Sequence, residues 1–398
     1  MTSFQYALVD GVVETDVEVT IEGGLITHVA AGSTGEARAG LTLPGLANCH
    51  SHAFHRALRG HTQTERGSFW TWRDQMYRIA EQLTPDSYHA LAVEVYGEMR
   101  ATGITAVGEF HYVHHQADGT PYDDPNEMGR ALLAAADEAG IRIRLLDTCY
   151  LAAGFGQEPE GVQRRFSDGD AERWAERVEA FGDDRVGAAI HSVRAVPRDQ
   201  LGVVAQWARD RDVPLHVHLS EQVAENDACE AVHGLTPTQL LADEGVLGPM
   251  TTAVHATHLT ETDVRLLGES RAFVCFCPTT ERDLADGIGP SRFLHDAGAR
   301  LTLGSDSHAV IDLFEEMRAV EMHERLATRQ RGHWSAAELL AAATYAGHES
   351  LGFPDAGRIA VDQRADLVTV DLTSVRTRGT GASAETLVFA ASGADVVP

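Results

Sequence analysis

Residues 46–52 read LANCHSH, an apolar segment that ends in two histidines spaced two residues apart. Seven further short apolar segments follow along the chain, and an amphipathic helix pattern precedes most of them. Strands that alternate with helices favour a parallel sheet, and eight of them predict an α/β fold, the closed (β/α)₈ barrel. The seven segments are residues 104–110, 141–150, 186–192, 214–220, 252–258, 272–278 and 300–307.

The clearest helix signal begins at Thr84, which supplies a capping hydroxyl, and Pro85, which suits the first helical position. Apolar residues then recur at helical spacing until Gly103 ends the pattern. This predicted buried face comprises Tyr88, Leu91, Ala92, Val95 and Met99.

The two ends of the chain have a different pattern. Residues 3–45 alternate apolar and polar side chains and turn at Gly23-Gly24, which is typical of a β-hairpin. Residues 357–372 have the same character. We therefore predict a small β-sandwich-like domain assembled from residues 1–43 and 353–398, beside a catalytic barrel domain at residues 44–352.

Composition excludes several classes of function. A formal charge of −27 argues against a nucleic-acid partner, because phosphates require a basic surface. No apolar run could span a membrane and no signal-peptide pattern opens the chain, so we expect a cytoplasmic protein with no membrane partner. All 32 basic residues are arginine, which excludes Schiff-base lysine chemistry and a carboxylated lysine bridging two metals.

The five cysteines form no CxxC pair, and we expect buried, reduced thiols. Cys275 and Cys277 could instead bind a metal, but core packing is the stronger interpretation because free cysteines are commonly buried.

Unusual polar residues fall at the carboxyl ends of most predicted strands, where barrels carry their active sites. Strand period points His50 and His52 to one face, and paired imidazoles suit a divalent metal. An HxH motif alone is weak evidence, and His218, His255 and Asp306 at the same end of the barrel strengthen it. His216 also faces inward; we prefer His218 because Glu221 follows it just beyond the strand, within reach of a substrate.

Several motifs resemble the amidohydrolase superfamily, in its branch of single-metal deaminases: PGLANCHSHAFHRALRG, HVHLSE, AVHATHL and LGSDSH. Four more are similar to the formimidoylglutamate deiminase family: SFWTWRDQMY, VGEFHYVHH, HSVRAVP and CPTTERDLADGIGP. The resemblance covers about residues 43–350. It implies one divalent metal ion, zinc, bound by His50, His52, His218 and Asp306. It also implies substrate contacts from Arg73, Tyr112, His191 and Arg194.

Two departures from the family pattern stand out. His55 occupies a position that is usually Gln, so we count it as a substrate contact that bears on substrate preference. The chain also stops soon after TLVFAASGADVVP, where relatives continue into further β structure, which affects only the small domain.

The resemblance implies hydrolysis of N-formimino-L-glutamate, a step of histidine breakdown, to N-formyl-L-glutamate and ammonia. The metal lowers the pKa of water towards ~7. Asp306 would take the water's proton, Glu221 would pair with the cationic imino nitrogen, and His255 would stabilise charge and shuttle a proton. The arginines would bind the carboxylates of this small dicarboxylate amidine as planar forks. We also expect a homodimer.

Each assignment has a structural alternative. Arg73 could form only a surface ion pair, and Tyr112 and His191 could be core residues satisfied by the backbone. The aromatic run at residues 69–72, within the excursion 53–83, could be a lid or a subunit contact. We interpret Glu109 and His111 as structural supports, and His114 and His115 as solvated loop residues.

Two other functions remain open. One is a different single-metal deaminase that acts on a purine, pyrimidine or guanidine. Its pocket would need flat apolar walls and amide groups, whereas this chain offers paired arginines. The other is a non-catalytic binding or scaffold protein, against which the full set of candidate ligands with Glu221 and His255 argues.

Overall fold

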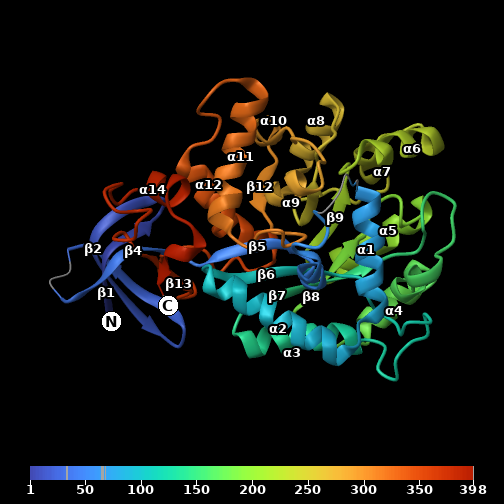
Figure 1. The fold of residues 1–398 in the computed structure, drawn as a ribbon, viewed down its shortest axis with the longest axis horizontal. Coiled ribbons are helices and arrows are strands. Elements are labelled where there is room, and N and C mark those ends of the chain that lie inside the picture. The colour runs from blue at the N-terminus through green and yellow to red at the C-terminus, as the bar shows by residue number, and fades with distance from the viewer. Residues whose placement is uncertain (33–34, 64–66, 68, 398) are drawn as a thin grey trace.

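The computed structural model describes residues 1–32, 35–63, 67 and 69–397, and most of the chain forms a barrel of eight parallel strands (Figure 1). The strands are neighbours in chain order, from β5 to β12. Each overlaps one predicted apolar segment, so the predicted (β/α)₈ barrel is confirmed. The strands are β5 (Leu46–Ser51), β6 (Ile104–His111), β7 (Arg142–Cys149), β8 (Val186–Ile190), β9 (Leu215–Leu219), β10 (Thr251–His255), β11 (Phe273–Phe276) and β12 (Arg300–Leu303).

The barrel closes between its first and last strands, just beyond the end of β12. An isolated bridge pairs Ser51 with Asp306. The amide of Asp306 donates to the carbonyl of His50 at 3.0 Å, and the amide of His52 donates to the carbonyl of Asp306 at 3.2 Å. A Cβ on Gly304 would lie 2.8 Å from Cβ of His50 and 2.9 Å from its backbone nitrogen, so only glycine fits there. The backbone of three predicted metal ligands therefore forms the closing seam.

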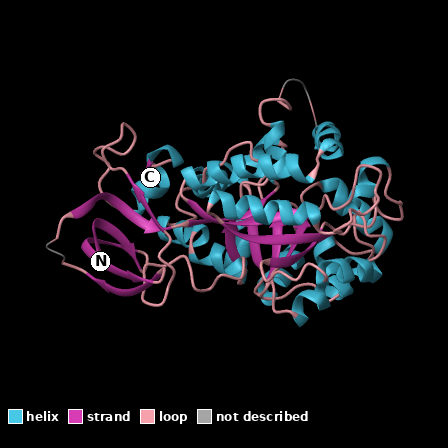
Figure 2. Ribbon diagram, turned by 90° about the horizontal axis from the view of Figure 1, so that it is seen from below, coloured by secondary structure: helices cyan, strands magenta, loops and turns pink. Residues whose placement is uncertain are grey.

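Helices surround the strands (Figures 1 and 2). α2 begins as predicted, because Thr84 accepts a hydrogen bond from the amide of Ser87 and Pro85 is its first residue. Four of its five predicted apolar residues are buried, and Leu91 is half-buried. The helices are α1 (Phe69–Gln82), α2 (Pro85–Ala101), α3 (Glu127–Ala139), α4 (Ala171–Glu179), α5 (Arg198–Asp210), α6 (Val223–His233), α7 (Pro237–Asp243), α8 (Glu261–Ser270), α9 (Pro278–Asp283), α10 (Ser291–Ala297), α11 (Leu313–Thr328), α12 (Ala336–Ala343), α13 (Tyr345–Ser350) and α14 (Ala384–Phe389). The described residues also form three short 3₁₀ segments: η1 (Ala53–Leu58), η2 (Gly161–Phe166) and η3 (Gly393–Asp395).

Both chain ends contribute to a second, six-stranded sheet, which lies at the left of Figure 1. Its order is β14-β13-β4-β1-β2-β3, and its pairs are antiparallel except β1 with β4. The strands are β1 (Thr2–Val9), β2 (Val12–Glu22), β3 (Leu25–Ala30), β4 (Ala37–Pro44), β13 (Leu367–Val370) and β14 (Val396–Val397). The predicted turn at Gly23-Gly24 joins β2 to β3. Near the carboxyl end, α14 contacts α11 and α12. The boundaries predicted for the two domains stay a prediction.

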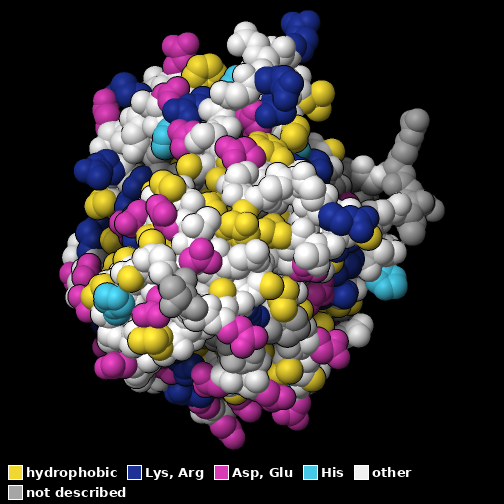
Figure 3. Space-filling view, turned by 90° about the vertical axis from the view of Figure 1, so that its left-hand side faces the viewer, with side chains coloured by type: hydrophobic (Ala, Val, Ile, Leu, Met, Phe, Trp, Pro, Cys, Tyr) yellow, Lys and Arg dark blue, Asp and Glu magenta, His cyan; other side chains and the backbone are white. Residues whose placement is uncertain are grey.

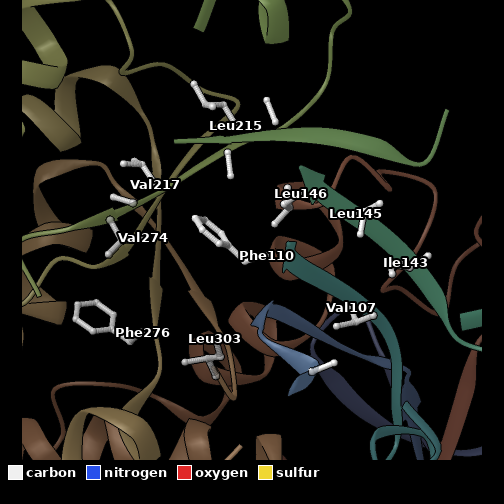
Figure 4. Packing of buried hydrophobic residues seen from close by; sticks show 14 of the residues in the cluster. Val107, Phe110, Ile143, Leu145, Leu146, Leu215, Val217, Val274, Phe276 and Leu303 are labelled. Atoms are coloured by element: carbon white, nitrogen blue, oxygen red, sulfur yellow. The ribbon is translucent and has the colours of Figure 1, made fainter. Parts of the chain in front are cut away.

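Phe110 of β6 projects towards the centre of the barrel among the apolar side chains of the neighbouring strands (Figure 4). Its ring centroid lies 5.1 Å from that of His50, 5.3 Å from that of His52 and 4.3 Å from that of His218. The apolar core therefore ends in an aromatic floor directly beneath the predicted metal ligands.

The charged surface and the buried cysteines are as the amino-acid composition leads us to expect. On the face made by the terminal sheet, arginines are interspersed with acidic side chains (Figure 3). All five cysteines are buried and free, as expected. None of the helices in the described ranges is long and apolar enough to cross a membrane.

Candidate metal centre and active site

The four predicted metal ligands converge at the carboxyl ends of β5, β9 and β12, and all are buried. Nε2 of His218 lies 3.0 Å from Nε2 of His50 and 3.3 Å from Nε2 of His52. Oδ1 of Asp306 lies 3.3 Å from Nε2 of His50 and 3.5 Å from Nε2 of His52. Ligand atoms about 2.0–2.1 Å from a tetrahedral ion are about 3.3–3.4 Å apart. These four distances are close to the spacing of ligand atoms around a single divalent ion, and the imidazole nitrogens of His50, His52 and His218 lie within 4.8 Å of one another.

The other nitrogens of two ligand histidines fix their orientation. Nδ1 of His52 lies 2.9 Å from the carbonyl oxygen of Phe110, and Nδ1 of His218 lies 2.9 Å from that of His191. A carbonyl oxygen only accepts, so both Nδ1 atoms carry protons and both Nε2 atoms present lone pairs to the centre. His216, the alternative ligand, faces elsewhere, with Nε2 at 3.4 Å from the carbonyl oxygen of Ser350.

The backbone is strained where the strands reach the site. Left-handed φ angles occur at Ser220 (50°), His255 (70°), Ala256 (48°), Asp306 (42°) and His308 (58°). Non-glycine residues rarely adopt this conformation, and such outliers cluster at functional sites.

His255, at the end of β10, sits among carboxylates. Its Nε2 is 3.9 Å from Oε1 of Glu221 and 3.8 Å from Oδ2 of Asp306, and its Nδ1 is 3.5 Å from Oε1 of Glu281. Burial alone would lower the pKa of His255, but these three carboxylates raise it well above its usual value. Burial raises the pKa of Glu221 to about 7, against the opposing effect of His255.

The two oxygens of Asp306 have different neighbours. Oδ1 faces His50 and His52, whereas Oδ2 faces His255. Burial would raise the pKa of Asp306, but His50, His255 and His52 together hold it well below its usual range. The ionised carboxylate can therefore ligate through one oxygen and receive a proton on the other.

All five predicted substrate contacts line one cavity above this centre, together with His52, His218, Glu221, His255 and Asp306. Those contacts are His55, Arg73, Tyr112, His191 and Arg194. Nε2 of His55 lies 3.1 Å from the hydroxyl of Tyr112. Burial lowers the pKa of His55 to about 3, so its ring is neutral.

The two arginines of the cavity have different surroundings. Nε of Arg194 donates to Oε2 of Glu225 at 3.0 Å. Arg73 forms no ion pair with any described residue; its guanidinium lies 4.5 Å from the ring centroid of Trp70, and its buried Nε has no hydrogen-bond partner. Arg73 therefore offers a guanidinium that no carboxylate in the described part of the chain neutralises.

The aromatic run lies on α1. Phe69 and Trp72 line the cavity, whereas the Trp70 side chain is 42% exposed. This arrangement suits a wall or lid through Phe69 and Trp72 and leaves Trp70 open to solvent. Ser68 of the motif, and residues 64–66 of the excursion, lie outside the described residues.

The expectation that His114 and His115 are solvated is wrong: they are 1% and 3% exposed. Both join a buried network in which Arg177 of α4 pairs with Asp147 at 2.7 Å and with Asp168 at 2.9 Å. Nε2 of His115 lies 3.1 Å from Asp168. The guanidinium of Arg177 supplies the cation for both aspartates, so we interpret this cluster as structural.

Glu109 acts as a support, as predicted. Its carboxylate accepts from the amide of Ala53 and from Oγ of Ser51, both at 2.6 Å. Glu225 and Glu281 were not predicted to contribute. The only sequence signal for Glu281 was its place in CPTTERDLADGIGP, and Glu225 carried none.

Comparison with known proteins gives consistent matches. The model of the Amidohydrolase family matches residues 41–397. Formimidoylglutamate deiminase of Pseudomonas aeruginosa is 39% identical over 374 residues, which are 89% of this chain and 82% of that protein. A 5-methylthioadenosine/S-adenosylhomocysteine deaminase of Natronomonas pharaonis is 31% identical over 390 residues, 96% of this chain and 85% of that protein.

Solved structures match the whole fold. An amidohydrolase of Brucella melitensis superposes with a TM-score of 0.89 at 32% identity, over 99% of this chain and 94% of its own. An adenosine deaminase of Xanthomonas campestris with bound zinc has a TM-score of 0.84 at 24% identity, over 99% of this chain and 90% of its own. The latter similarity establishes the fold alone.

Proposed function

The chain belongs to the amidohydrolase family, and we propose that it hydrolyses the formimino group of N-formimino-L-glutamate to give N-formyl-L-glutamate and ammonia. The family and the Pseudomonas aeruginosa relative support the coarser activity, metal-dependent hydrolysis of a carbon–nitrogen bond. The finer choice of substrate depends on the cavity.

One observation carries that choice: Arg73 and Arg194 line the same cavity as Asp306 and His255, and Arg73 has no acidic partner among the described residues. A protein of net charge −27 repels a dianion, so its binding requires fixed local cations. Guanidinium forks bind carboxylates with paired hydrogen bonds. Two arginines match the two carboxylates of a glutamate derivative.

We propose that a single zinc ion is held by His50, His52, His218 and Asp306. Three imidazole nitrogens and one carboxylate oxygen are the ligand types that suit this ion. When bound, it supplies a Lewis acid that makes water nucleophilic near neutral pH. Arg73 lines the same cavity as His52, His218 and Asp306, so one bound substrate can contact both the arginine and the metal site.

The proton transfers follow from the positions of three side chains. Oδ2 of Asp306, which faces His255, takes the proton released from water as it adds to the formimino carbon. Glu221, whose pKa burial raises to about 7, can pair with the imino nitrogen or give it a proton. His255, 3.8 Å from Asp306 and 3.9 Å from Glu221, links the two carboxylates. The leaving nitrogen departs as ammonia once it is protonated.

A second candidate is deamination of a purine nucleoside. The Natronomonas pharaonis relative is a deaminase of 5-methylthioadenosine and S-adenosylhomocysteine, and Phe69, Trp72 and Tyr150 line the cavity with aromatic surface. Rings of this kind could stack on a purine. 5-Methylthioadenosine, however, carries no anion for Arg73 to bind, and S-adenosylhomocysteine carries one carboxylate for the two cavity arginines.

Ammonia release decides between these substrates. We expect the zinc-loaded protein to turn over N-formimino-L-glutamate faster than its aspartate and glycine analogues, and not to turn over 5-methylthioadenosine. Chelated protein is the blank, and Arg194→Gln should weaken binding of the glutamate compound. Turnover of 5-methylthioadenosine with none of any formimino acid would overturn the proposal in favour of the second candidate. The expected homodimer and cytoplasmic location stay predictions; sedimentation analysis tests the first.

A further inference from the structure

Glu281 lies behind His255, on the side away from the predicted metal ligands, and the proton transfers above do not use it. We propose that Glu281 is a positioning residue that orients the His255 ring and keeps a proton on Nδ1, so that Nε2 alone exchanges protons during the reaction. This inference rests on the proposed function for its kinetic consequence, but not for its geometry.

The contacts of the carboxylate define its role. Oε1 of Glu281 accepts a hydrogen bond from the amide of Cys277 at 2.8 Å, and the same oxygen lies 3.5 Å from Nδ1 of His255. Glu281 and His255 are 2% and 1% exposed, so water does not compete for either group. A backbone amide can only donate, and it therefore keeps an acceptor oxygen directed at this point. An acceptor facing Nδ1 requires that nitrogen to carry the proton.

Glu281 is also held rigidly. Glu281 lies in α9, next to Thr280. The Thr280 side chain is hydrogen-bonded to the loop that carries Asp306, because the amide of Ser307 donates to Oγ1 of Thr280 at 3.1 Å. On the other side of the same turn, the carboxylate of Glu316 accepts from the amide of Thr279 at 3.0 Å. The first turn of α9 therefore ties Glu281 and Asp306 into one unit, with the His255 ring between them.

This arrangement assigns separate tasks to the two ring nitrogens. Nε2 faces Asp306 and Glu221, at 3.8 Å and 3.9 Å, which are the groups that handle the protons of water and of the leaving nitrogen. The protonated ring can give its Nε2 proton to the leaving nitrogen and regain one at Nε2 from Oδ2 of Asp306, while Nδ1 keeps its own proton. Without Glu281, the neutral ring could carry its proton on Nε2 instead of Nδ1. Nε2 would then have no lone pair with which to accept a proton from Asp306.

Two substitutions separate orientation from charge. Glu281→Leu removes the acceptor, whereas Glu281→Gln retains an amide oxygen that the amide of Cys277 must attract, so the NH₂ group is directed away from Nδ1. We expect Glu281→Leu to lower kcat by about 100-fold or more, the scale of losing a general acid–base group, with KM nearly unchanged. Glu281→Gln should keep kcat within about 10-fold of the wild type, because the orientation survives.

Glu316→Gln is the matched control, since it perturbs the same turn of α9 without facing His255. It should lower the unfolding temperature and leave kcat close to the wild-type value. A kcat loss in Glu316→Gln equal to that in Glu281→Leu would show that α9 packing alone matters, and would overturn the proposal.

The second readout does not depend on turnover. Imidazole ¹⁵N spectra of zinc-loaded protein, assigned by the signals missing from His255→Asn, report which nitrogen is protonated when the ring is neutral. We expect a protonated Nδ1 in the wild type and in Glu281→Gln, and a shift of the proton to Nε2 in Glu281→Leu. An unprotonated Nδ1 in the wild type would refute the inference. If the wild type hydrolyses no formimino acid, the proposed function fails while this spectrum still decides the role of Glu281.

Discussion

The same substitution should have different consequences at the two arginines of the cavity. Arg194 is paired with Glu225, whose side chain is 1% exposed and whose Oε1 has no hydrogen-bond partner among the described residues. Arg194→Gln therefore leaves a buried carboxylate without its cation. Arg73 has no such partner, and Arg73→Gln removes only its contact with the rings of Trp70 and Tyr77.

The sizes of these effects follow from the surroundings. Removing one member of a buried ion pair costs about 3–5 kcal/mol, so Arg194→Gln should lower the free energy of unfolding by that order. Losing a half-exposed cation–π contact costs about 0.5–1 kcal/mol, so Arg73→Gln should be nearly as stable as the wild type. Each variant also loses a charge-assisted bond to a substrate carboxylate, about 1.5–3 kcal/mol, which is roughly a 10- to 150-fold rise in KM.

Urea unfolding followed by tryptophan fluorescence, together with KM from ammonia release, measures both quantities. The double variant Arg194→Gln with Glu225→Gln is the key control, because it removes the buried charge along with its partner. It should recover stability to within about 1 kcal/mol of the wild type while KM stays raised. Wild-type stability in Arg194→Gln alone, or wild-type KM in the double variant, would refute this account.

Three further predictions concern the frame around the site. Arg177→Met should lower the free energy of unfolding by about 3–5 kcal/mol in urea titrations, with KM unchanged, because Asp147 loses its buried cation. Metal-free protein should lose stability as the pH rises from about 4.5 to about 8, because burial raises the pKa of Glu109 from 4.5 to about 8 and the folded chain retains a proton that the unfolded chain has released. Glu109→Gln should flatten the dependence of the urea midpoint on pH across this range. Gly304→Ala should be purified with less zinc by atomic absorption, since its Cβ would lie 2.8 Å from Cβ of His50.

The barrel and the convergence of the candidate metal ligands could be predicted because both depend on local pattern. Each strand is a short apolar run, and the alternation of side chains along a strand places His50 with His52 on one face. Strand period also places His216 and His218 on the same face of β9, but it does not show which of the two reaches the metal site at the end of the strand. The choice of His218 needed the position of Glu221, and the contact of His216 with Ser350, 134 residues away, could not be read from the pattern.

The groups that orient the site could not be predicted, because they come from helices whose placement depends on packing. Glu225 lies in α6 and Glu281 lies in α9, each several residues after a strand. The packing of these helices at the carboxyl end of the barrel brings Glu225 to Arg194 and Glu281 to His255. The prediction that His115 is solvated was wrong for the same reason. A histidine in a polar loop after a strand is expected to be solvated, unless a distant residue such as Asp168 covers it.

Closure of the barrel also brings the candidate metal ligands Asp306, His50 and His52 together. The backbone amide of Asp306 bonds to the carbonyl of His50, and its own carbonyl accepts from the amide of His52. These two bonds hold Asp306 at a φ of 42°, a conformation that an isolated loop would avoid. Before β12 docks against β5, Asp306 lacks these two backbone hydrogen bonds to His50 and His52. The last barrel strand thus completes both the sheet and the ligand set, so a bound ion that holds these ligands together also stabilises the seam that closes the barrel.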